Sequence, residues 1–302
     1  DFIHLPRACR LHCKNETEST TEITLSIVSE HINQVKASEA FSKQSGVFDK
    51  LYGNESMIQY KRKRVRDHIL QIAKPGGYML ELNCGTGEDA LFFAQHGFNV
   101  HATDASEGML SVLQKKFQVD SEQKVEVELC SFTNLRQLQN KGPFDSVYSN
   151  FGGLNCTGDL ETVLKDLRTV VKPGGIVTLV IISKFCLWET MLVFNGKFKT
   201  AFRRFFSSKG RKAHIEGSYF KCWYYAPSFV IKHMKPDFDL LALEGLCTLV
   251  PPSYIEGFPE KHPGLFSFLQ KKEERWKGKW PWKFIGDYYI ISFRAKPAES
   301  VS

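Results

Sequence analysis

Short apolar runs alternate with helical patterns between residues 78 and 182, and this alternation constrains the fold more than any other feature. The predicted strands are residues 78–82, 99–104, 125–130, 144–149 and 176–182. The last run is β-branched and apolar throughout, which is typical of a parallel strand covered on both faces. Helical spacing connects the strands over residues 88–96, 106–117 and 159–171, with Ser106 as the expected N-cap of the second helix. The pattern predicts an α/β fold with a doubly wound, mostly parallel sheet and right-handed crossovers.

The composition is that of a globular protein and excludes disordered, fibrous and coiled-coil chains. Of 302 residues, 42% are hydrophobic and 24% are charged. The longest apolar run, residues 176–182, is too short to cross a bilayer, and no basic-then-apolar leader opens the sequence. The eight cysteines are scattered, which suits reduced thiols. We therefore expect a cytoplasmic protein without a transmembrane segment.

A metal site is not expected. Cys9, His12 and Cys13 lie close together in the sequence, but no second Cys/His pair at zinc spacing follows them. We also expect residues 1–36 to be a polar, flexible tail, because residues 15–24 are almost entirely Glu, Thr, Ser and Asn. Residues 37–302 would then form one domain. Within it, an amphipathic region over residues 41–72 precedes the sheet, and a helix after Pro227 and strands near residues 239–249 and 288–295 complete it. Irregular insertions are expected at residues 183–226 and 251–286.

A glycine-rich turn, residues 83–87, follows the first strand and opens a helix. Small residues in such a turn let the backbone approach a ligand at the helix N-terminus. Residues 85–90 even satisfy the dinucleotide fingerprint G-x-G-x-x-A. Asp104, at the end of the next strand, is placed where a carboxylate can accept both ribose hydroxyls. A nucleotide-type ligand is therefore expected here, and the turn alone does not identify it.

Three features argue against a dinucleotide and for a nucleoside ligand that carries a positive charge. Glu81 before the turn would oppose a pyrophosphate but suits a cationic ligand, the Lys-Pro-Gly-Gly run 172–175 precedes the fifth strand, and the chain ends in a hairpin-like strand pair. With the turn, Asp104 and the strand at residues 144–149, these features resemble the class I S-adenosylmethionine-dependent methyltransferases. The resemblance is closest to a bacterial small-molecule subgroup related to quinone-biosynthesis enzymes. It rests on residues 88–91, 103–106, 149–156, 188–189 and 201–204.

The resemblance implies a Rossmann-like, seven-stranded fold with a lid-like insertion after strand five, and S-adenosylmethionine as cofactor. Glu81 and the turn would hold its methionine part, Asp104 the ribose, Ala105 and Met109 the adenine, and Ser131 and Phe132 the adenine edge. Asn150 and Phe151 would face the methyl group, while Phe48, Tyr52 and Arg64 close the site. Arg64 would pair with the cofactor's carboxylate. The implied cofactor residues are Glu81, Asn83, Cys84, Gly85, Gly87, Asp104, Ala105, Met109, Ser131, Phe132, Asn150, Phe151, Tyr52 and Arg64.

The sequence departs from the family pattern at two positions, and several residues have a purely structural alternative. Asn83 replaces the first glycine of the turn, which Asn tolerates because it visits positive φ. Ser131 replaces an acidic residue, at a cost of about 1 kcal/mol if one hydrogen bond to the adenine is lost. Structurally, Asp104 could simply cap the following helix and Asn150 could close a turn. Met109 and Phe132 could be plain core.

The expected function is methyl transfer to a small or lipid-like acceptor. Methylation of RNA and a non-catalytic cofactor-binding role remain as alternatives. No motif fixes a general base, and His214, Tyr219 and Tyr224 are candidates by chemistry alone. The oligomeric state is not indicated.

The chain contains 24 Phe, which is a high number, and both insertions are rich in aromatic residues. The first should overhang the site as a lid with an apolar acceptor pocket, or else form a satellite core. Residues 190–215 contain no acid and carry as many positive charges as the net charge of +7, which suggests a negative group on the acceptor. These cations are Lys197, Lys199, Arg203, Arg204, Lys209, Arg211 and Lys212. In the second insertion, Trp276, Trp280 and Trp282 alternate with lysines, as in an RNA-binding, membrane-binding or merely wet surface.

Overall fold

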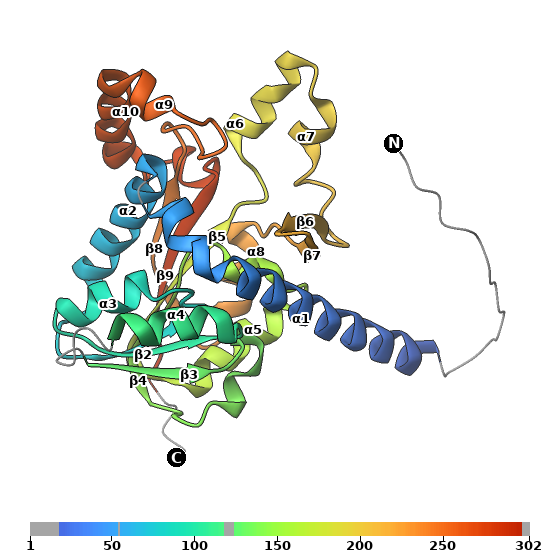
Figure 1. Cartoon of the computed structure of the whole chain (residues 1–302), viewed down its shortest axis with the longest axis vertical. Helices are drawn as coiled ribbons and strands as arrows, with labels where there is room; N and C mark the ends of the chain where they lie inside the picture. Colours follow the sequence, from blue (N-terminus) through green and yellow to red (C-terminus); the bar gives the residue numbers. More distant parts are fainter. Residues whose placement is uncertain (1–17, 54, 118–123, 298–302) are drawn as a thin grey trace.

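The computed structural model describes residues 18–53, 55–117 and 124–297, and its centre is a seven-stranded sheet (Figure 1). The strand order is β3-β2-β1-β4-β5-β9-β8. The strands are β1 (Tyr78–Leu82), β2 (Asn99–Asp104), β3 (Val125–Leu129), β4 (Phe144–Ser149), β5 (Val171–Ile182), β8 (Phe238–Leu246) and β9 (Tyr288–Ala295). The first five pair in parallel, and β9 runs antiparallel to both β5 and β8. The expected mostly parallel sheet with a terminal antiparallel pair is confirmed.

Helices cover both faces of this sheet. The helices are α1 (Glu18–Tyr52), α2 (Ser56–Ile72), α3 (Glu88–Gln95), α4 (Glu107–Phe117), α5 (Leu160–Asp166), α6 (Leu187–Thr190), α7 (Phe198–Phe202), α8 (Pro227–Met234), α9 (Phe258–Lys261) and α10 (Pro263–Trp276). Side chains alternate across each strand, so Leu80 and Leu82 pack with α5 and α8 while Met79 packs with α2, α3 and α4. The two cores on opposite faces establish the doubly wound arrangement.

The sequence predicted a polar tail over residues 1–36, whereas the structure has a helix from Glu18 onward. Residues 18–52 form one helix, α1, whose C-terminal part lies on the body of the molecule while its N-terminal part projects beyond it (Figure 1). Its buried stripe contains Asn33, Ala37, Ala40 and Gln44, which lie at helical spacing. Asn33 donates through Nδ2 to the carbonyl of Cys156 (2.9 Å), and its Oδ1 accepts from the Lys221 backbone (2.6 Å). Half of this stripe is amide side chains, so a hydrophobic pattern does not reveal it.

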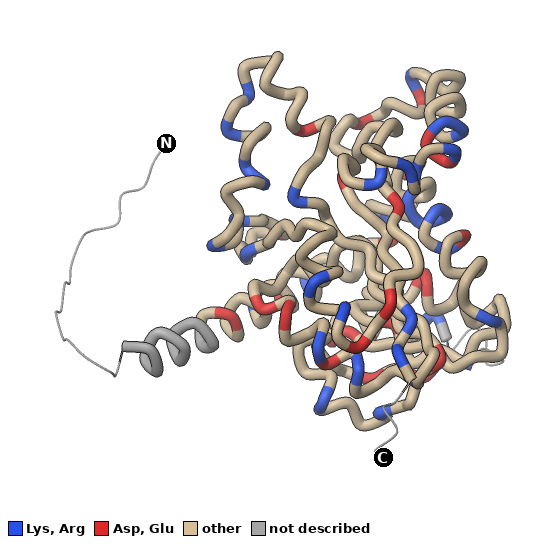
Figure 2. The backbone as a smooth tube through the Cα atoms, turned by 180° about the vertical axis from the view of Figure 1, so that it is seen from behind, with Lys and Arg blue, Asp and Glu red and all other residues tan. Residues whose placement is uncertain are grey.

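The insertion at residues 183–226 is only partly irregular. It contains α6, α7 and a hairpin of β6 (Arg211–Ile215) and β7 (Ser218–Cys222), which packs against α1. Arg204 holds the insertion on the sheet, since it is buried and pairs with Glu189 (2.6 Å) and Asp287 (2.5 Å). Figure 2 shows the basic residues gathered along this insertion.

The second insertion, residues 251–286, contains α9 and α10 and is therefore not irregular. Phe266 and Leu269 of α10 pack on the core that α2 shares. The buried Glu273 accepts hydrogen bonds from the backbone of residues 247–250 at 2.8–2.9 Å. The buried stripe of α10 is short and contains this carboxylate, so the sequence shows no clear hydrophobic periodicity for the helix. Among the described residues, no helix has both the length and the apolar character needed to cross a membrane.

Candidate functional site

A cavity lies at the carboxyl ends of β1, β2 and β4, where α1 crosses the sheet edge. It holds about 1000 Å³ of empty space, including open solvent at its mouth. Most of the residues expected at a cofactor site line it, namely Glu81, Asn83, Cys84, Gly85, Asp104, Ala105, Met109, Ser131, Phe132, Asn150 and Phe151. Phe48 lines it too. The topology thus brings together residues from four separate segments of the sequence.

The turn after β1 is held open by left-handed backbone. Asn83, Gly85 and Gly87 have φ of 50°, 57° and 77°. Asn83 keeps this geometry through its side chain, which accepts from Ser149 Oγ (2.6 Å) and donates to the carbonyl of Asn150 (3.1 Å). An Asn is therefore accommodated at this position, as its tolerance of positive φ predicts.

The two glycines of the turn serve different purposes. A Cβ placed on Gly85 would meet no atom within 4 Å, and Gly85 lines the cavity, so the missing side chain leaves space for a ligand. A Cβ on Gly87 would lie 2.0 Å from Cδ1 of Leu113 on α4. Gly87 does not line the cavity, and the structure assigns it to close packing between the turn and α4 instead of to ligand contact.

Asp104 orients the turn from the end of β2. Its Oδ2 accepts from the Gly85 backbone (2.9 Å) and its Oδ1 from the Ser106 backbone (2.8 Å). Burial raises its pKa, and these backbone hydrogen bonds oppose that rise. The N-cap of α4 is Ser106, whose hydroxyl accepts from Met109 N (3.1 Å), as expected from the sequence. Asp104 is thus not needed as the cap and faces the cavity.

Glu81 is a buried carboxylate with one unused oxygen. Oε2 has no hydrogen-bond partner among the described residues, and neither has the hydroxyl of its neighbour Tyr148. Burial and the nearby Asp89 raise the pKa of Glu81 well above its ordinary value, while Arg62 and Arg66 oppose the rise. An unpaired buried acceptor is costly, so this oxygen is poised for a donor or a cation in the cavity.

A charged network borders the cavity beside Phe151. Asp89 pairs with Arg62 (3.0 Å) and Arg66 (2.7 Å) and accepts from Nδ2 of Asn150 (2.8 Å). Burial alone would raise the pKa of Asp89, but the two arginines and Asn150 lower it overall. The Arg62 guanidinium lies 4.9 Å from the centre of the Phe151 ring. Asn150 therefore links the end of β4 to α2 and α3, beyond closing a turn.

Helix α1 forms one wall of the cavity, and Phe48 is the one residue of this wall that the sequence predicted. Gln34, Ala37, Ser38 and Phe41 line it in addition to Phe48. Ser38 donates to the carbonyl of Ala105 (2.7 Å), and Lys116 of α4 pairs with Asp49 (2.7 Å). These contacts hold the helix over the loops that follow β1 and β2.

Besides Gly87, two of the expected residues do not reach the cavity. Tyr52 lies behind Phe48, with ring centres 4.8 Å apart, and its hydroxyl accepts from Gln44 (3.3 Å). Arg64 faces the opposite way and pairs with Glu244 (3.3 Å) and Glu273 (3.3 Å). The prediction for Arg64 is wrong because α2 turns residue 64 toward β8 and α10. Arg62 reaches the cavity instead, two positions away on another side of the helix.

Further lining residues lie within or beside the predicted motifs, but the sequence offered no reason to name them individually: Thr86, Glu88, Asp89, Cys130, Gly153 and Cys156. Ser131 caps the turn after β3, where Thr133 Oγ1 donates to Gln34 Oε1 of α1 (2.8 Å). Gln34 thus brings an amide close to the expected adenine edge, which lacks an acidic residue.

No residue of the insertion at 183–226 lines this cavity. That holds for His214, Tyr219 and Tyr224 as well, so they are not placed as general bases here. Arg203 and Arg204 are engaged with Glu189, and Lys277 of the second insertion pairs with Glu244 (3.2 Å). In the described ranges, no group of three or more His, Cys, Asp and Glu side chains could hold a metal ion. Cys9, His12 and Cys13 lie outside those ranges.

The comparison with protein families decides between the two nucleotide chemistries. Residues 79–175, from β1 to the start of the long β5, match the family described as "Methyltransferase domain". This segment of the chain is a methyltransferase domain. The resemblance to class I enzymes, drawn from the turn, Asp104 and the Pro-Gly-Gly run, is confirmed, and the dinucleotide interpretation is not supported.

Curated relatives of this chain are named demethylmenaquinone methyltransferases, which agrees with the resemblance to a quinone-related subgroup. A demethylmenaquinone methyltransferase of Bacillus velezensis is 34% identical over 140 residues, 43% of this chain and 59% of the relative. The corresponding enzyme of Lactococcus lactis is 28% identical over 57% of this chain and 67% of its own length. The chain thus covers less than two thirds of the length of the Bacillus relative.

Solved structures share the fold at low sequence identity. The 1,6-didemethyltoxoflavin-N1-methyltransferase of Burkholderia thailandensis, solved with its substrate and S-adenosylhomocysteine, has a TM-score of 0.53 and 14% identity, with coverage of 88% of this chain and 90% of that one. At this identity the likeness establishes the Rossmann-like methyltransferase fold alone.

Proposed function

We propose that this protein binds S-adenosylmethionine in the cavity and transfers its methyl group to a small, lipid-like acceptor. The unpaired Oε2 of Glu81 carries the proposal. A buried carboxylate oxygen facing a cavity suits the ammonium group of the cofactor's methionine part, whereas it would repel the pyrophosphate of a dinucleotide. The methyltransferase domain over residues 79–175 supports the same cofactor.

The remaining cofactor contacts follow from the wall of the cavity. Asp104 would accept the ribose hydroxyls, Gly85 leaves room for the chain of the cofactor, and Ala105 and Met109 lie beside the adenine. Ser131, Phe132 and Gln34 would meet the adenine edge. Arg62, in the role expected of Arg64, is the cation available to the cofactor's carboxylate. We also propose that the domain begins within α1, because Gln34 and Ser38 lie in this wall.

Methyl transfer from S-adenosylmethionine depends more on alignment of the acceptor than on general acid–base catalysis. The cofactor supplies a methyl group already activated on a sulfonium, so the protein has to place the acceptor in line and keep water out. Alignment of this kind lowers barriers by several kcal/mol, up to about 7–11 in ideal cases. Phe41, Phe48, Phe132 and Phe151 give the cavity an apolar lining that excludes water and suits a lipid-like acceptor. The names of the Bacillus and Lactococcus relatives support a quinone-type acceptor.

A negative group on the acceptor is part of the proposal, with support from Lys61 instead of the basic insertion. Lys61 is buried, its Nζ lies 5.7 Å from the centre of the Phe151 ring, and it donates to Ser253 (3.2 Å). It has no carboxylate partner among the described residues. Lys61 does not line the cavity itself, but its buried ammonium next to the lining residue Phe151 would favour an acceptor that ionises, such as a quinol.

Titration calorimetry with S-adenosylmethionine, S-adenosylhomocysteine and NAD tests the cofactor. We expect the first two to bind and NAD not to bind. Glu81→Gln and Asp104→Ala should each weaken binding by about tenfold or more, since each removes a charge-assisted hydrogen bond of roughly 1.5–3 kcal/mol. Asp239→Asn, an exposed carboxylate of β8, is the matched control and should leave affinity unchanged. Thermal unfolding of each variant identifies those that fail to fold.

Transfer is tested with radiolabelled S-adenosylmethionine and, as acceptors, demethylmenaquinol, tRNA and a cell extract separated into lipid, small molecules, RNA and protein. We expect label in the quinol or in the lipid and small-molecule fractions. Tight binding of NAD without S-adenosylmethionine would refute the cofactor assignment. Label in RNA alone would refute the acceptor class, and binding without any transfer would indicate a non-catalytic binding protein.

A further inference from the structure

The insertion at residues 183–226 carries an unusual set of exposed apolar side chains. Phe194 and Phe206 are 86% and 70% exposed, and Phe198 is 58% exposed. Met191, Phe202, Phe205 and Tyr219 are exposed at 41–61%. We call the exposed residues 191–206 the phenylalanine face. So many exposed, purely apolar rings on one short segment are costly in water and mark an interaction surface.

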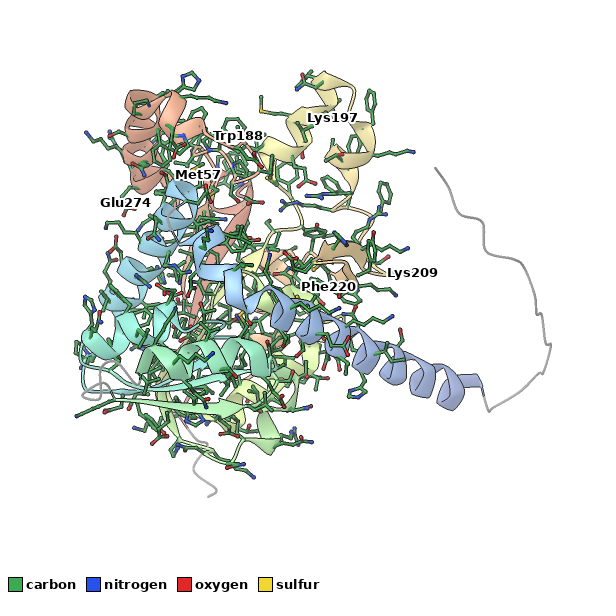
Figure 3. All side chains as sticks on the ribbon, viewed as in Figure 1. Met57, Trp188, Lys197, Lys209, Phe220 and Glu274 are labelled. Atoms are coloured by element: carbon green, nitrogen blue, oxygen red, sulfur yellow. The ribbon has the colours of Figure 1, made fainter. Side chains whose placement is uncertain are left out.

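Unpaired cations surround this face. Lys197 and Lys199 lie between Phe194 and Phe202, and Lys209 and Lys212 follow on the loop and on β6. All four are exposed, and none has an ion-pair partner in the described part of the chain. Lys197 lies on the outermost part of the insertion and Lys209 on its side, both directed away from the sheet (Figure 3). The surface therefore combines apolar rings with net positive charge.

The phenylalanine face is held on the body of the protein. Arg204, buried beneath it, pairs with Glu189 and Asp287 and donates to the carbonyls of Ser183 and Asp287 at 3.0 Å. Trp188 donates to the carbonyl of Thr248 (3.0 Å). These bonds fix the base of the insertion on β5 and β9, so the exposed rings are presented by a fixed support.

A second element projects at the same end of the molecule. Figures 1 and 2 both show α9 and α10 extending beyond the sheet on the side to which α6 and α7 extend. Leu265 and Phe268 of α10 are 49% and 53% exposed, and Lys272 lies 5.3 Å from the centre of the Phe268 ring. Two apolar and basic projections at one end match a broad, flat partner.

We propose that this end of the protein docks on an anionic membrane surface, with the phenylalanine face inserted among the lipids and the four lysines on the phosphate groups. Apolar rings interleaved with lysines bind an interface through both apolar burial and attraction to anionic lipid. Fully apolar phenylalanines fit acyl chains better than a nucleic acid, whose stacking sites combine rings with a basic groove. The proposal does not depend on methyl transfer, although it would bring a lipid-like acceptor to the protein.

Vesicle flotation of the full chain tests the proposal without cofactor. The vesicles contain either phosphatidylcholine alone or phosphatidylcholine with phosphatidylglycerol in equal parts. We expect binding to the anionic vesicles only, with a loss at about 0.5 M salt because charge attraction is screened. Removing the rings with Phe194→Ser/Phe198→Ser and the charges with Lys197→Gln/Lys199→Gln should each weaken binding by about tenfold.

Matched controls separate these effects from general changes in surface. Leu129→Ser removes an apolar side chain that is 52% exposed on β3, and Lys74→Gln/Lys141→Gln removes two exposed lysines elsewhere. Both should bind vesicles like the wild type. Wild-type binding by the Phe194→Ser/Phe198→Ser variant would overturn the proposal, as would no binding of the wild type to either vesicle. The proposal would be overturned in favour of a nucleic acid if the protein bound tRNA more tightly than vesicles, in a salt-sensitive way, and if the Phe194→Ser/Phe198→Ser variant bound tRNA equally well.

Discussion

At the scale of single residues, Gly85 and Gly87 make opposite predictions although they share one turn. Gly87→Ala should lower the free energy of unfolding by about 3 kcal/mol, because positive φ costs about 1–2 and the new Cβ meets Leu113 at 2.0 Å. Gly85→Ala should cost only the backbone term of about 1–2 kcal/mol, yet weaken S-adenosylmethionine binding because its Cβ enters the cavity. Urea unfolding and calorimetry measure the two effects. Equal loss of stability in both variants would contradict this division.

Single residues were predictable from the sequence where a motif fixes both backbone and direction. Glu81 and Asp104 end neighbouring parallel strands, so their position at one edge of the sheet follows from topology alone. The direction of Arg64 was not predictable in this way, because the four consecutive basic residues 61–64 place a cation on nearly every side of α2. Which one reaches the cavity depends on how α2 packs against β8 and α10, and those contacts are distant in sequence.

At the scale of elements, the pairing of α2 with β8 predicts a pH dependence. Burial alone would raise the pKa of Glu244, but hydrogen bonding to His68 (3.0 Å) and the charges of His68, Lys277 and Arg64 lower it to about 2. A depressed carboxylate pKa stabilises the fold above the ordinary value near 4.5 and loses that contribution as the pH falls toward 2. The contribution at neutral pH is up to about 3 kcal/mol.

Urea unfolding of the wild type and Glu244→Gln from pH 7 to pH 3 measures this contribution. We expect the wild type to be more stable by up to about 3 kcal/mol at pH 7, and the difference to shrink as the pH falls below about 4.5. A difference that stays constant over this range would assign the effect to packing instead of ionisation. Asp239→Asn, exposed on the same strand, is the control and should show no such trend.

The strands were predictable and several helices were not. Residues 78–82, 99–104, 144–149 and 288–295 are strands with the expected bounds. Their side chains are mostly buried, so short, largely apolar runs of sequence mark them. The stripes of α1 and α10 contain buried polar side chains, Gln44 in one and Glu273 in the other. Their burial depends on partners far away in the sequence, such as Tyr60 for Glu273 (2.9 Å), and no local pattern reports it.

At the scale of the whole molecule, the candidate site lies between the edge of the sheet and α1, the N-terminal helix. The sheet edge supplies Glu81, Asp104 and Phe151, while α1 supplies the opposite wall. Ser42 and Ser106 share a hydrogen bond (2.6 Å), and Thr86 donates to Asp49 (2.5 Å). A ligand in the cavity would therefore contact both parts and tie them together.

The position of the cavity between the sheet edge and α1 predicts how S-adenosylhomocysteine, the demethylated cofactor, stabilises the protein. S-adenosylhomocysteine at about 100 times its dissociation constant should add about 2.7 kcal/mol and raise the Tm by several degrees. If α1 is a wall of the site, hydrogen exchange of its amides over residues 33–48 should slow together with that of residues 83–87. Helix α8, which does not line the cavity, serves as the internal reference. A rise in Tm with unchanged exchange in α1 would mean that the ligand is held by the sheet edge alone, and NAD at the same concentration should produce neither effect.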